Sequence, residues 1–228
     1  MNEKTIKPIA TIRTDFPTKF GIPRQSGLTP SLRSTIVFEP EFRTRDAIRG
    51  LESFSHIWAV WGFSDAEYKG ALTVRPPRLG GNTRLGVFAT RSPFRPNGLG
   101  LSSLELVGIE KTDSHGYVLI VGGADMKDGT PIYDIKPYLP YTDSHPNAVG
   151  GFADPLVGEK LKVDFPGELL ELLPEEKRAS ALALLADDPR PAYQNDPTRE
   201  YGFPFVDCEI EFTVDGDTLH VFRVTQHK

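Results

Sequence analysis

The sequence predicts a mainly β chain with a closed or strongly curved sheet in its first two thirds and a smaller C-terminal α+β lobe. Two observations support this. Short apolar runs rich in Val, Ile and aromatic residues recur between turn residues, with little helical periodicity. No helices of 10 to 15 residues separate these runs, which argues against a doubly wound α/β fold. We expect domains over residues 1–150 and 151–228.

Seven runs in the first domain are predicted to be strands. They are residues 5–14, 34–40, 55–63, 83–90, 101–110, 116–125 and 130–138. The exception is the segment 44–54, where Ala47, Ile48 and Leu51 fit one face of a short helix.

The pattern changes after Gly150. Residues 166–187 are predicted to be helical, and Pro174 either opens a second helix or kinks a single one. The run 205–214 then alternates apolar and acidic residues as a strand does, and a turn at 215–217 leads into 218–226 to complete a hairpin. The boundary is predicted between Gly150 and Pro166, where Gly, Pro and Asp are frequent.

The composition is that of an ordinary soluble globular protein, with 39% hydrophobic and 25% charged residues. The N-terminus lacks an apolar signal-peptide core, and no run of about 18 apolar residues occurs, so we expect a cytoplasmic protein. Cys208 is the only cysteine, which excludes an internal disulfide. Its neighbours predict a buried strand cysteine rather than a nucleophile.

Charge is unevenly distributed along the chain. The whole chain has a formal net charge of -5, yet residues 1–150 carry a net +3 and residues 151–228 a net -8. The segment 75–100 holds five arginines, five glycines and four prolines, and no acidic residue or lysine. Arginine forks bind phosphate and carboxylate, so this segment predicts an anion-binding rim. The alternative is that the arginines hold an irregular backbone together.

Two further segments combine turns with chemically useful side chains. Residues 187–201 place Arg190 between two prolines, with Tyr193 nearby for stacking, which suits either a nucleic-acid clamp or a rigid turn. Residues 123–141 hold Asp125, Asp128 and Asp134 around tight turns, for binding hydroxyl groups or for making Asx turns.

Common enzyme fingerprints are missing from the sequence. No G-x-G-x-x-G element follows a strand, and no Walker A, H-E-x-x-H or G-x-S-x-G motif occurs. The five histidines share no ligand spacing, so no metal site is predicted.

Taken together, these segments resemble the TsaA-like (TrmO) family of tRNA methyltransferases, which use S-adenosylmethionine to methylate threonylcarbamoyl-adenosine beside the anticodon. The resemblance covers almost the whole chain. It rests on residues 12–28, 46–58, 73–81, 86–100, 128–141 and 188–193. It implies a β-barrel-like, non-Rossmann N-terminal domain and a homodimer.

The resemblance also implies roles for particular residues. The cofactor-binding residues would be Pro23, Arg24, Gln25, Ser64, Asp65, Arg91, Leu101, Ala124, Asp125, Met126, Lys127 and Asp128. The chain departs from the family pattern at Ser64 and Asp65, where relatives often have His-Gln.

Methyl transfer needs no covalent residue, but its acceptor is an amide-like nitrogen that a nearby base would assist. We expect Asp134, or another carboxylate of the segment 128–134, to be that catalytic base. Arginines would contact the phosphates of the tRNA anticodon loop, and a tyrosine would stack on one of its bases. These tRNA-binding residues are Arg75, Arg78, Arg84, Arg95, Arg190 and Tyr193.

Two other functions remain open from the sequence. A non-catalytic S-adenosylmethionine- or RNA-binding module would use the same sheet and arginine rim. A hydrolase built on Asp and His would act without S-adenosylmethionine. Protection from thermal unfolding by S-adenosylmethionine, and transfer of labelled methyl to tRNA, separate these readings.

Overall fold

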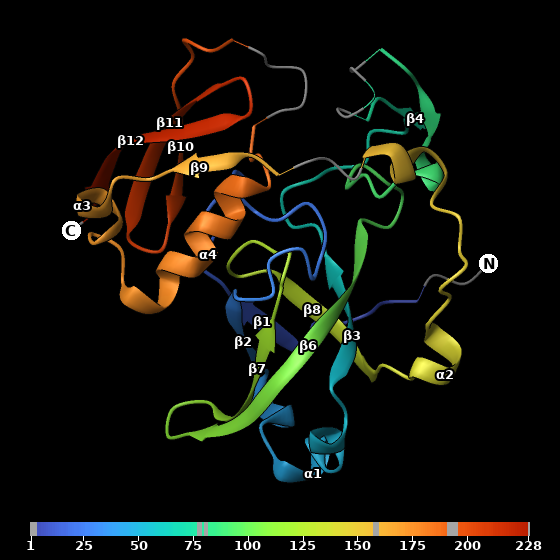
Figure 1. Ribbon diagram of the computed structural model, residues 1–228. Coiled ribbons are helices and arrows are strands. Elements are labelled where there is room, and N and C mark those ends of the chain that lie inside the picture. Colours follow the sequence, from blue (N-terminus) through green and yellow to red (C-terminus); the bar gives the residue numbers. More distant parts are fainter. Residues whose placement is uncertain (1–3, 77–78, 80–81, 157–159, 191–195, 228) are drawn as a thin grey trace. The chain divides into compact units, whose positions relative to one another are not determined.

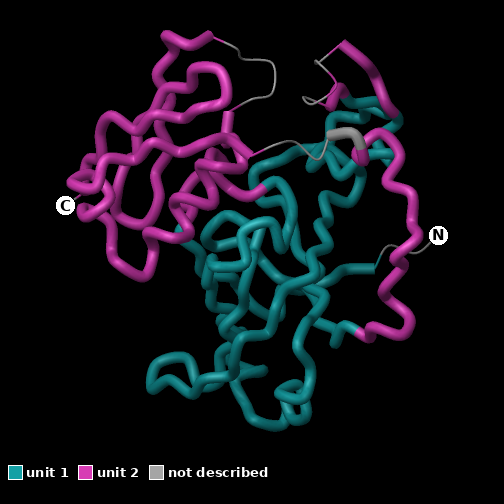
Figure 2. Tube along the Cα trace, in the orientation of Figure 1, with its two compact units in different colours: residues 1–15, 24–74, 86–138 teal, residues 16–23, 75–85, 139–228 magenta. Residues whose placement is uncertain are grey.

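The computed structural model describes residues 4–76, 79, 82–156, 160–190 and 196–227 (Figure 1). The chain divides into two compact units (Figure 2). The first comprises residues 1–15, 24–74 and 86–138, and the second residues 16–23, 75–85 and 139–228. The segments 16–23 and 75–85 thus group with the C-terminal part of the chain. That residues 1–150 and 151–228 are separate domains stays a prediction.

The first unit is built on six antiparallel strands whose sheet closes into a ring, in the order β1-β2-β7-β6-β3-β8. The strands are β1 (Ala10–Arg13), β2 (Arg33–Phe38), β3 (His56–Gly62), β6 (Leu99–Thr112), β7 (Gly116–Gly122) and β8 (Pro131–Pro137). The prediction of a mainly β chain with a closed sheet is therefore confirmed.

Strand β6, the long green arrow in Figure 1, makes the closure possible. Its first half pairs with β3 and its second half with β7, and the β6–β7 register shifts between Leu106 and Gly108. A shift of this kind bends a strand and increases its twist. One long strand therefore pairs with two neighbouring strands of the ring, β3 and β7.

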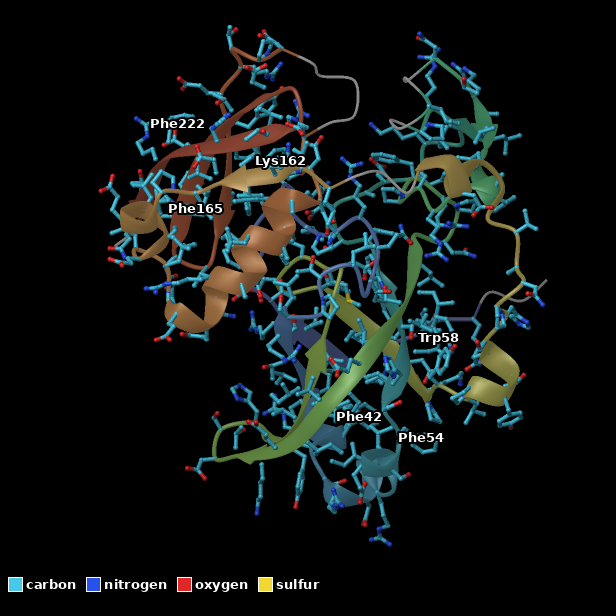
Figure 3. All side chains as sticks on the ribbon, in the orientation of Figure 1. Phe42, Phe54, Trp58, Lys162, Phe165 and Phe222 are labelled. Carbon is cyan, nitrogen blue, oxygen red and sulfur yellow. The ribbon has the colours of Figure 1, made fainter. Side chains whose placement is uncertain are left out.

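Alternation along the strands fills the inside of the ring. On β3 the side chains of Ile57, Ala59 and Trp61 are buried, while Trp58 and Val60 between them lie on the outer face. Figure 3 labels Trp58, whose ring packs against Tyr138 with 5.6 Å between ring centroids. The core of this unit is therefore the interior of the ring, which also contains Ile12, Ile36 and Leu119.

Helices in the first unit are short. The predicted helical segment 44–54 forms α1 (Arg45–Ile48) and a 3-10 turn, η2 (Leu51–Ser53), separated by Gly50 at φ 89°. This left-handed conformation is open to glycine and ends the helix. A further 3-10 turn, η1, spans Pro40–Phe42.

The segment 83–90 differs from its prediction as a strand. It forms the two-residue strand β5 (Leu85–Gly86), which pairs with β4 (Thr73–Val74), and then a 3-10 turn, η4 (Val87–Ala89). The backbone N–H of Val87 donates to the carbonyl of Leu72 at 3.0 Å, so this stretch is tied to a loop and not to the ring.

The second unit contains a four-stranded sheet in the order β10-β11-β12-β9. Its elements are β9 (Lys162–Asp164), β10 (Tyr201–Phe205), β11 (Cys208–Asp215) and β12 (Thr218–Gln226), with α2 (Pro140–Asp143), η5 (Gly151–Leu156), α3 (Gly167–Leu170) and α4 (Glu175–Ala186). The predicted hairpin of 205–214 and 218–226 is present, although its first strand begins at Cys208.

Helix α4 begins directly after Pro174, so the proline separates it from α3 and does not kink a single helix. The buried side chains of Ala181, Leu184 and Leu185 form its inner face. The carbonyl of Ala186 accepts a hydrogen bond from the backbone of Leu161 just before β9.

Aromatic residues form the core of the second unit. Phe203, Phe205 and Phe212 are fully buried, and Phe16 packs on Phe205 with 5.9 Å between ring centroids. Cys208 is buried on the same sheet, as the sequence predicted, and burial raises the pKa of its thiol. No helix in the described part of the chain is long and apolar enough to span a membrane.

Candidate functional site

One end of the ring collects the loops that carry most of the predicted cofactor residues. Because neighbouring strands are antiparallel, the ends of β1, β3 and β7 lie beside the starts of β2, β6 and β8. The loops at this end therefore include residues 24–32, 63–72, 87–98 and 123–130. We call this the loop end of the ring.

Backbone hydrogen bonds fix two of these loops to each other. The N–H of Gly27 donates to the carbonyl of Gly123 at 2.9 Å, and the N–H of Gly123 donates to the carbonyl of Leu32 at 3.1 Å. Gly123 has φ 69°, and a Cβ on it would lie 3.0 Å from the Gly27 backbone. The close approach of the two chains therefore requires glycine here.

Charged side chains at the loop end form pairs between loops. The guanidinium of Arg91 donates to the side-chain oxygen of Gln25. The Nζ atom of Lys127 lies 2.5 Å from Oδ2 of Asp65. These contacts bring together residues that the resemblance grouped at the cofactor although they are far apart in sequence.

Asp128 is anchored to the end of β1. Its Oδ2 atom lies 3.2 Å from Nη1 of Arg13, and its Oδ1 atom accepts the backbone N–H of Thr14 at 3.0 Å. The hydroxyl of Thr14 donates to the carbonyl of Met126 at 3.2 Å. The loop 124–128 is therefore held at two points, Met126 and Asp128, by the end of β1. Ala124 and Met126 turn into the core, with 1% of each exposed.

Asp125 is the deepest carboxylate of this loop. Its Oδ1 atom accepts the hydroxyl of Ser102 at 2.6 Å, and that hydroxyl oxygen accepts the indole N–H of Trp61 at 2.9 Å. The pKa of Asp125 lies above its usual value because burial disfavours the charged carboxylate. Four smaller effects partly offset this shift: the hydrogen bond from the Ser102 hydroxyl, hydrogen bonds from the backbone N–H groups of Asp125 and Ser26, and the charge of Arg91.

A cavity of about 410 Å³ opens beside the loop that follows β3. Its volume falls within the usual range of ligand pockets, about 300 to 1,000 Å³. Aromatic and polar groups line it together. They include Phe63, Ser64, Tyr68, Arg95, Asn97 and Tyr133.

Two predicted residues lie elsewhere on the first unit. Leu101 on β6 and Asp134 on β8 are both paired with Val60, which stands between them on β3. Val60 faces outward, so both side chains lie on the outer face of the ring. Asp134 is 48% exposed and paired with Lys136 at 2.9 Å. The structure thus does not bring Asp134 together with Asp125, and its catalytic role stays a prediction.

Two further predicted cofactor residues directly precede Gln25 in the chain. Pro23 is buried and grouped with the second unit, and Arg24 is exposed at the start of the segment 24–74. The carbonyl of Arg24 accepts a hydrogen bond from the side chain of Gln25 at 2.5 Å.

The predicted tRNA-binding residues have different surroundings. Arg75 and Arg84 are exposed. Nη1 of Arg95 donates to the carbonyl of Thr90 at 3.2 Å and so supports the loop that it belongs to. Arg78 and Tyr193 lie outside the described residues. Their roles in tRNA binding stay predictions.

Arg190 is held within the second unit and is only 9% exposed. Its Nε and Nη2 atoms donate to the two carboxylate oxygens of Asp188 at 2.8 and 2.9 Å. This arrangement suits the rigid turn that the sequence left open as one alternative, and the role of Arg190 in tRNA binding stays a prediction.

Sequence reasoning missed Ser102 as the partner of Asp125 and Trp61 as the partner of Ser102. A signal was available, because alternation along 101–110 places Ser102 on the same face as Leu104, and a buried hydroxyl requires a hydrogen-bond partner. In the described part of the chain no three His, Cys, Asp or Glu side chains are grouped to hold a metal ion.

Comparison with known proteins gives matches over both units. Residues 11–144 match the family model of the tRNA-methyltransferase O N-terminal domain, and residues 158–227 that of the TrmO C-terminal domain. The tRNA (adenine(37)-N6)-methyltransferase of Escherichia coli K12 is 39% identical, over 98% of this chain and 99% of that protein. That of Eikenella corrodens is 48% identical, over 72% of this chain and 92% of its own length.

Solved structures agree with this match. The crystal structure of TrmO from Pseudomonas aeruginosa superposes with a TM-score of 0.80 at 33% identity, covering 99% of this chain and 98% of that one. A 41% identical relative from the same species, over 91% of each chain, is described as a candidate S-adenosylmethionine-dependent methyltransferase. Since both family domains match in order and the likeness runs through nearly the whole of these proteins, the chain belongs to the TrmO family.

Proposed function

We propose that this protein is a tRNA methyltransferase that transfers a methyl group from S-adenosylmethionine to the N6 nitrogen of threonylcarbamoyl-adenosine at position 37, next to the anticodon. The observation that carries the proposal is the match to the Escherichia coli tRNA (adenine(37)-N6)-methyltransferase across almost all of both chains. The arrangement of the loop end supports it.

The side chains of the loop end fit S-adenosylmethionine chemically. The cofactor carries a carboxylate, an ammonium group, a ribose diol and a cationic sulfonium. Arg91 and Lys127 supply positive charge for a carboxylate, and the carboxylates of Asp65, Asp125 and Asp128 suit hydroxyl and cationic groups. When bound, the cofactor supplies an activated methyl group.

The task of the protein is then to orient the two reactants and to exclude water. Gln25 and Arg91 fix each other, as do Asp65 and Lys127, so side chains from four loops are already in place before binding. A preorganised site of this kind loses little freedom on binding.

The cavity beside β3 suits an unstacked nucleobase. Phe63, Tyr68 and Tyr133 offer ring faces for stacking, and Asn97 offers an amide for the base edge. Arg75, Arg84 and Arg95 would meet phosphates of the anticodon loop. We place this activity in the cytoplasm, where tRNA is found.

We further propose that the protein is a homodimer with a β-barrel-like first unit, as the family resemblance implies. Large apolar side chains support an interface at the loop end, since Leu72 is 72% and Phe88 75% exposed on segments joined by a backbone hydrogen bond. Sedimentation equilibrium of wild type and Phe88→Ser tests this. A wild-type monomer at micromolar concentration contradicts it.

The decisive experiment is transfer of labelled methyl from S-adenosylmethionine to tRNA. We expect label in tRNA that carries the threonylcarbamoyl group and none in the same tRNA without it. A thermal shift with S-adenosylmethionine alone provides the control for cofactor binding. If the cofactor binds and no label enters the modified tRNA, the protein is a binding module and the proposal is wrong.

A further inference from the structure

The carboxyl group of Asp125 ends a chain of hydrogen bonds that begins inside the ring. The indole N–H of Trp61 donates to Oγ of Ser102, and the Ser102 hydroxyl donates to Oδ1 of Asp125. Trp61 is 7% and Ser102 1% exposed, so water does not compete for either of their hydrogen bonds. Because the indole occupies the Ser102 oxygen, the hydroxyl hydrogen is directed to the carboxylate.

Both donors stand on rigid elements. Trp61 is on β3 and Ser102 on β6, and their neighbours pair across the two strands. A Cβ on Gly100 would lie 2.3 Å from the Trp61 ring, so the indole rests directly on the β6 backbone. The orientation of the Asp125 carboxyl is therefore set by the ring and not by its own loop alone.

We propose that Asp125 is the catalytic residue that accepts the proton of the methylated nitrogen, and that Ser102 and Trp61 are positioning residues for its carboxyl. This inference rests on the proposed function. It differs from the expectations drawn from the sequence, in which Asp134 accepts the proton and Asp125 binds the cofactor.

The reaction balances with Asp125 as proton acceptor. The bond that forms joins the acceptor nitrogen to the methyl carbon. The bond that breaks joins that carbon to the sulfonium sulfur, which keeps the electron pair and loses its positive charge. The proton of the acceptor nitrogen passes to Asp125 and leaves to water after product release. A base of raised pKa is better matched to this step than an ordinary carboxylate.

Two other carboxylates of the loop end already form ion pairs with charged side chains. Asp65 is paired with Lys127, and Asp128 with Arg13. Asp125 instead accepts its side-chain hydrogen bond from a neutral hydroxyl, and the charge acting on it comes from Arg91 on the loop 87–98. It can take up a proton without the loss of a direct ion pair.

The first experiment separates the proton acceptor from the cofactor ligand. Asp125→Asn keeps the shape and the acceptor oxygen for Ser102. We expect kcat to fall about 100-fold or more, the size typical for loss of a general base, with the Kd for S-adenosylmethionine, measured by calorimetry, within about threefold of wild type. Glu110→Gln, at an exposed carboxyl on β6, is the matched control and should keep its activity.

Two outcomes overturn the proposal. Asp125→Asn with near wild-type kcat means that the proton goes elsewhere. Asp125→Asn without cofactor binding means that Asp125 is a cofactor ligand, as the sequence implied. Failure of the wild type to methylate tRNA contradicts the proposed function itself and is distinguishable from both.

The second experiment tests positioning. Ser102→Ala removes a hydrogen bond that favours the ionised carboxyl, so the pKa of Asp125 should rise. The acid limb of the kcat/KM profile should move to higher pH, and Ser102→Thr should restore it. Carbon-13 titration of the aspartate carboxyls, with Asp125→Asn for assignment, reads the same pKa without any turnover. Unchanged titration in both Ser102→Ala and Trp61→Phe means that the hydrogen-bond chain does not act on Asp125.

Discussion

The Nζ atom of Lys127 lies 2.5 Å from Oδ2 of Asp65, which joins the loop after β7 to the loop after β3. The two side chains are partly exposed, at 27% and 36%. Pairs of this exposure contribute little to stability, commonly about 0.2 to 1 kcal/mol. The pair is therefore better understood as fixing two loops of the candidate site than as holding the fold.

Removal of this ion pair should affect binding more than folding. We expect Lys127→Met to raise the Kd for S-adenosylmethionine several-fold, while the free energy of unfolding changes by less than about 1 kcal/mol. Lys136→Met breaks the exposed pair with Asp134 on the outer face and serves as control. Calorimetric titration and urea unfolding of both variants check this, and equal effects on Kd would count against the assignment.

The contact between Gly100 and Trp61 gives a second prediction. A methyl group at Gly100 would overlap the indole, so Gly100→Ala must displace Trp61. Overpacking of this kind costs about 1 to 3 kcal/mol, and displacement of the indole should also lower kcat. Gly108→Ala on the same strand meets no atom within 4 Å and should have neither effect. Urea unfolding and initial rates of the two variants provide the comparison.

Stability should depend on pH through Asp125. Its pKa is raised in the folded chain, so the folded state holds the proton more tightly than the unfolded state does. The resulting contribution to stability is fully present below the unfolded pKa of about 3.9 and is lost as pH rises through the folded pKa. As the pH rises through the folded pKa, the wild type gains a buried charge that Asp125→Asn lacks.

We accordingly expect the stability of Asp125→Asn to rise relative to that of wild type as the pH increases from about 4. Urea unfolding at a series of pH values measures both. A stability difference between the two proteins that does not change with pH would refute the raised pKa of Asp125.

Parts of the fold could not be read from the sequence for local reasons. Strand β10 was missed because Pro204 lies within it and because the alternating run that contains Cys208 continues backward to Phe205. The chain in fact turns at Val206, which has φ 57°. A non-glycine residue in this conformation has no sequence signal, since β-branched residues rarely adopt it.

The candidate site, like the fold, could be predicted from the sequence only in part. Residues of the loop end were grouped from a family resemblance, and the hydrogen bonds of Gln25 and Asp65 to Arg91 and Lys127 bring those loops together. The link from Asp125 to Ser102 depends on how the loop after β7 folds back over β6. That is a matter of strand order in the closed ring, and a single sequence does not specify strand order.

Arg190 should act mainly on stability. Its guanidinium makes two hydrogen bonds to Asp188, and hydrogen bonds to charged groups contribute about 1.5 to 3 kcal/mol. Arg190→Ala should lower the free energy of unfolding by about that amount, whereas Asp188→Asn, which tolerates the φ of 51° at this position, should cost less. Weaker tRNA binding at unchanged stability would instead support the clamp that the sequence suggested.

The exposed Arg75 should contribute to the salt dependence of tRNA binding. An arginine that contacts one phosphate of a single-stranded loop contributes about 0.7 to the slope of log K against log salt concentration. We expect Arg75→Ala to weaken tRNA binding, to reduce that slope by about this amount, and to leave the Kd for S-adenosylmethionine unchanged. Arg49→Ala is the control, because Arg49 follows α1 at the opposite end of the ring from the loop end and is paired with Asp46. Filter-binding titrations of tRNA between about 50 and 200 mM salt measure the slope, and an identical slope for Arg75→Ala and wild type would mean that Arg75 meets no phosphate.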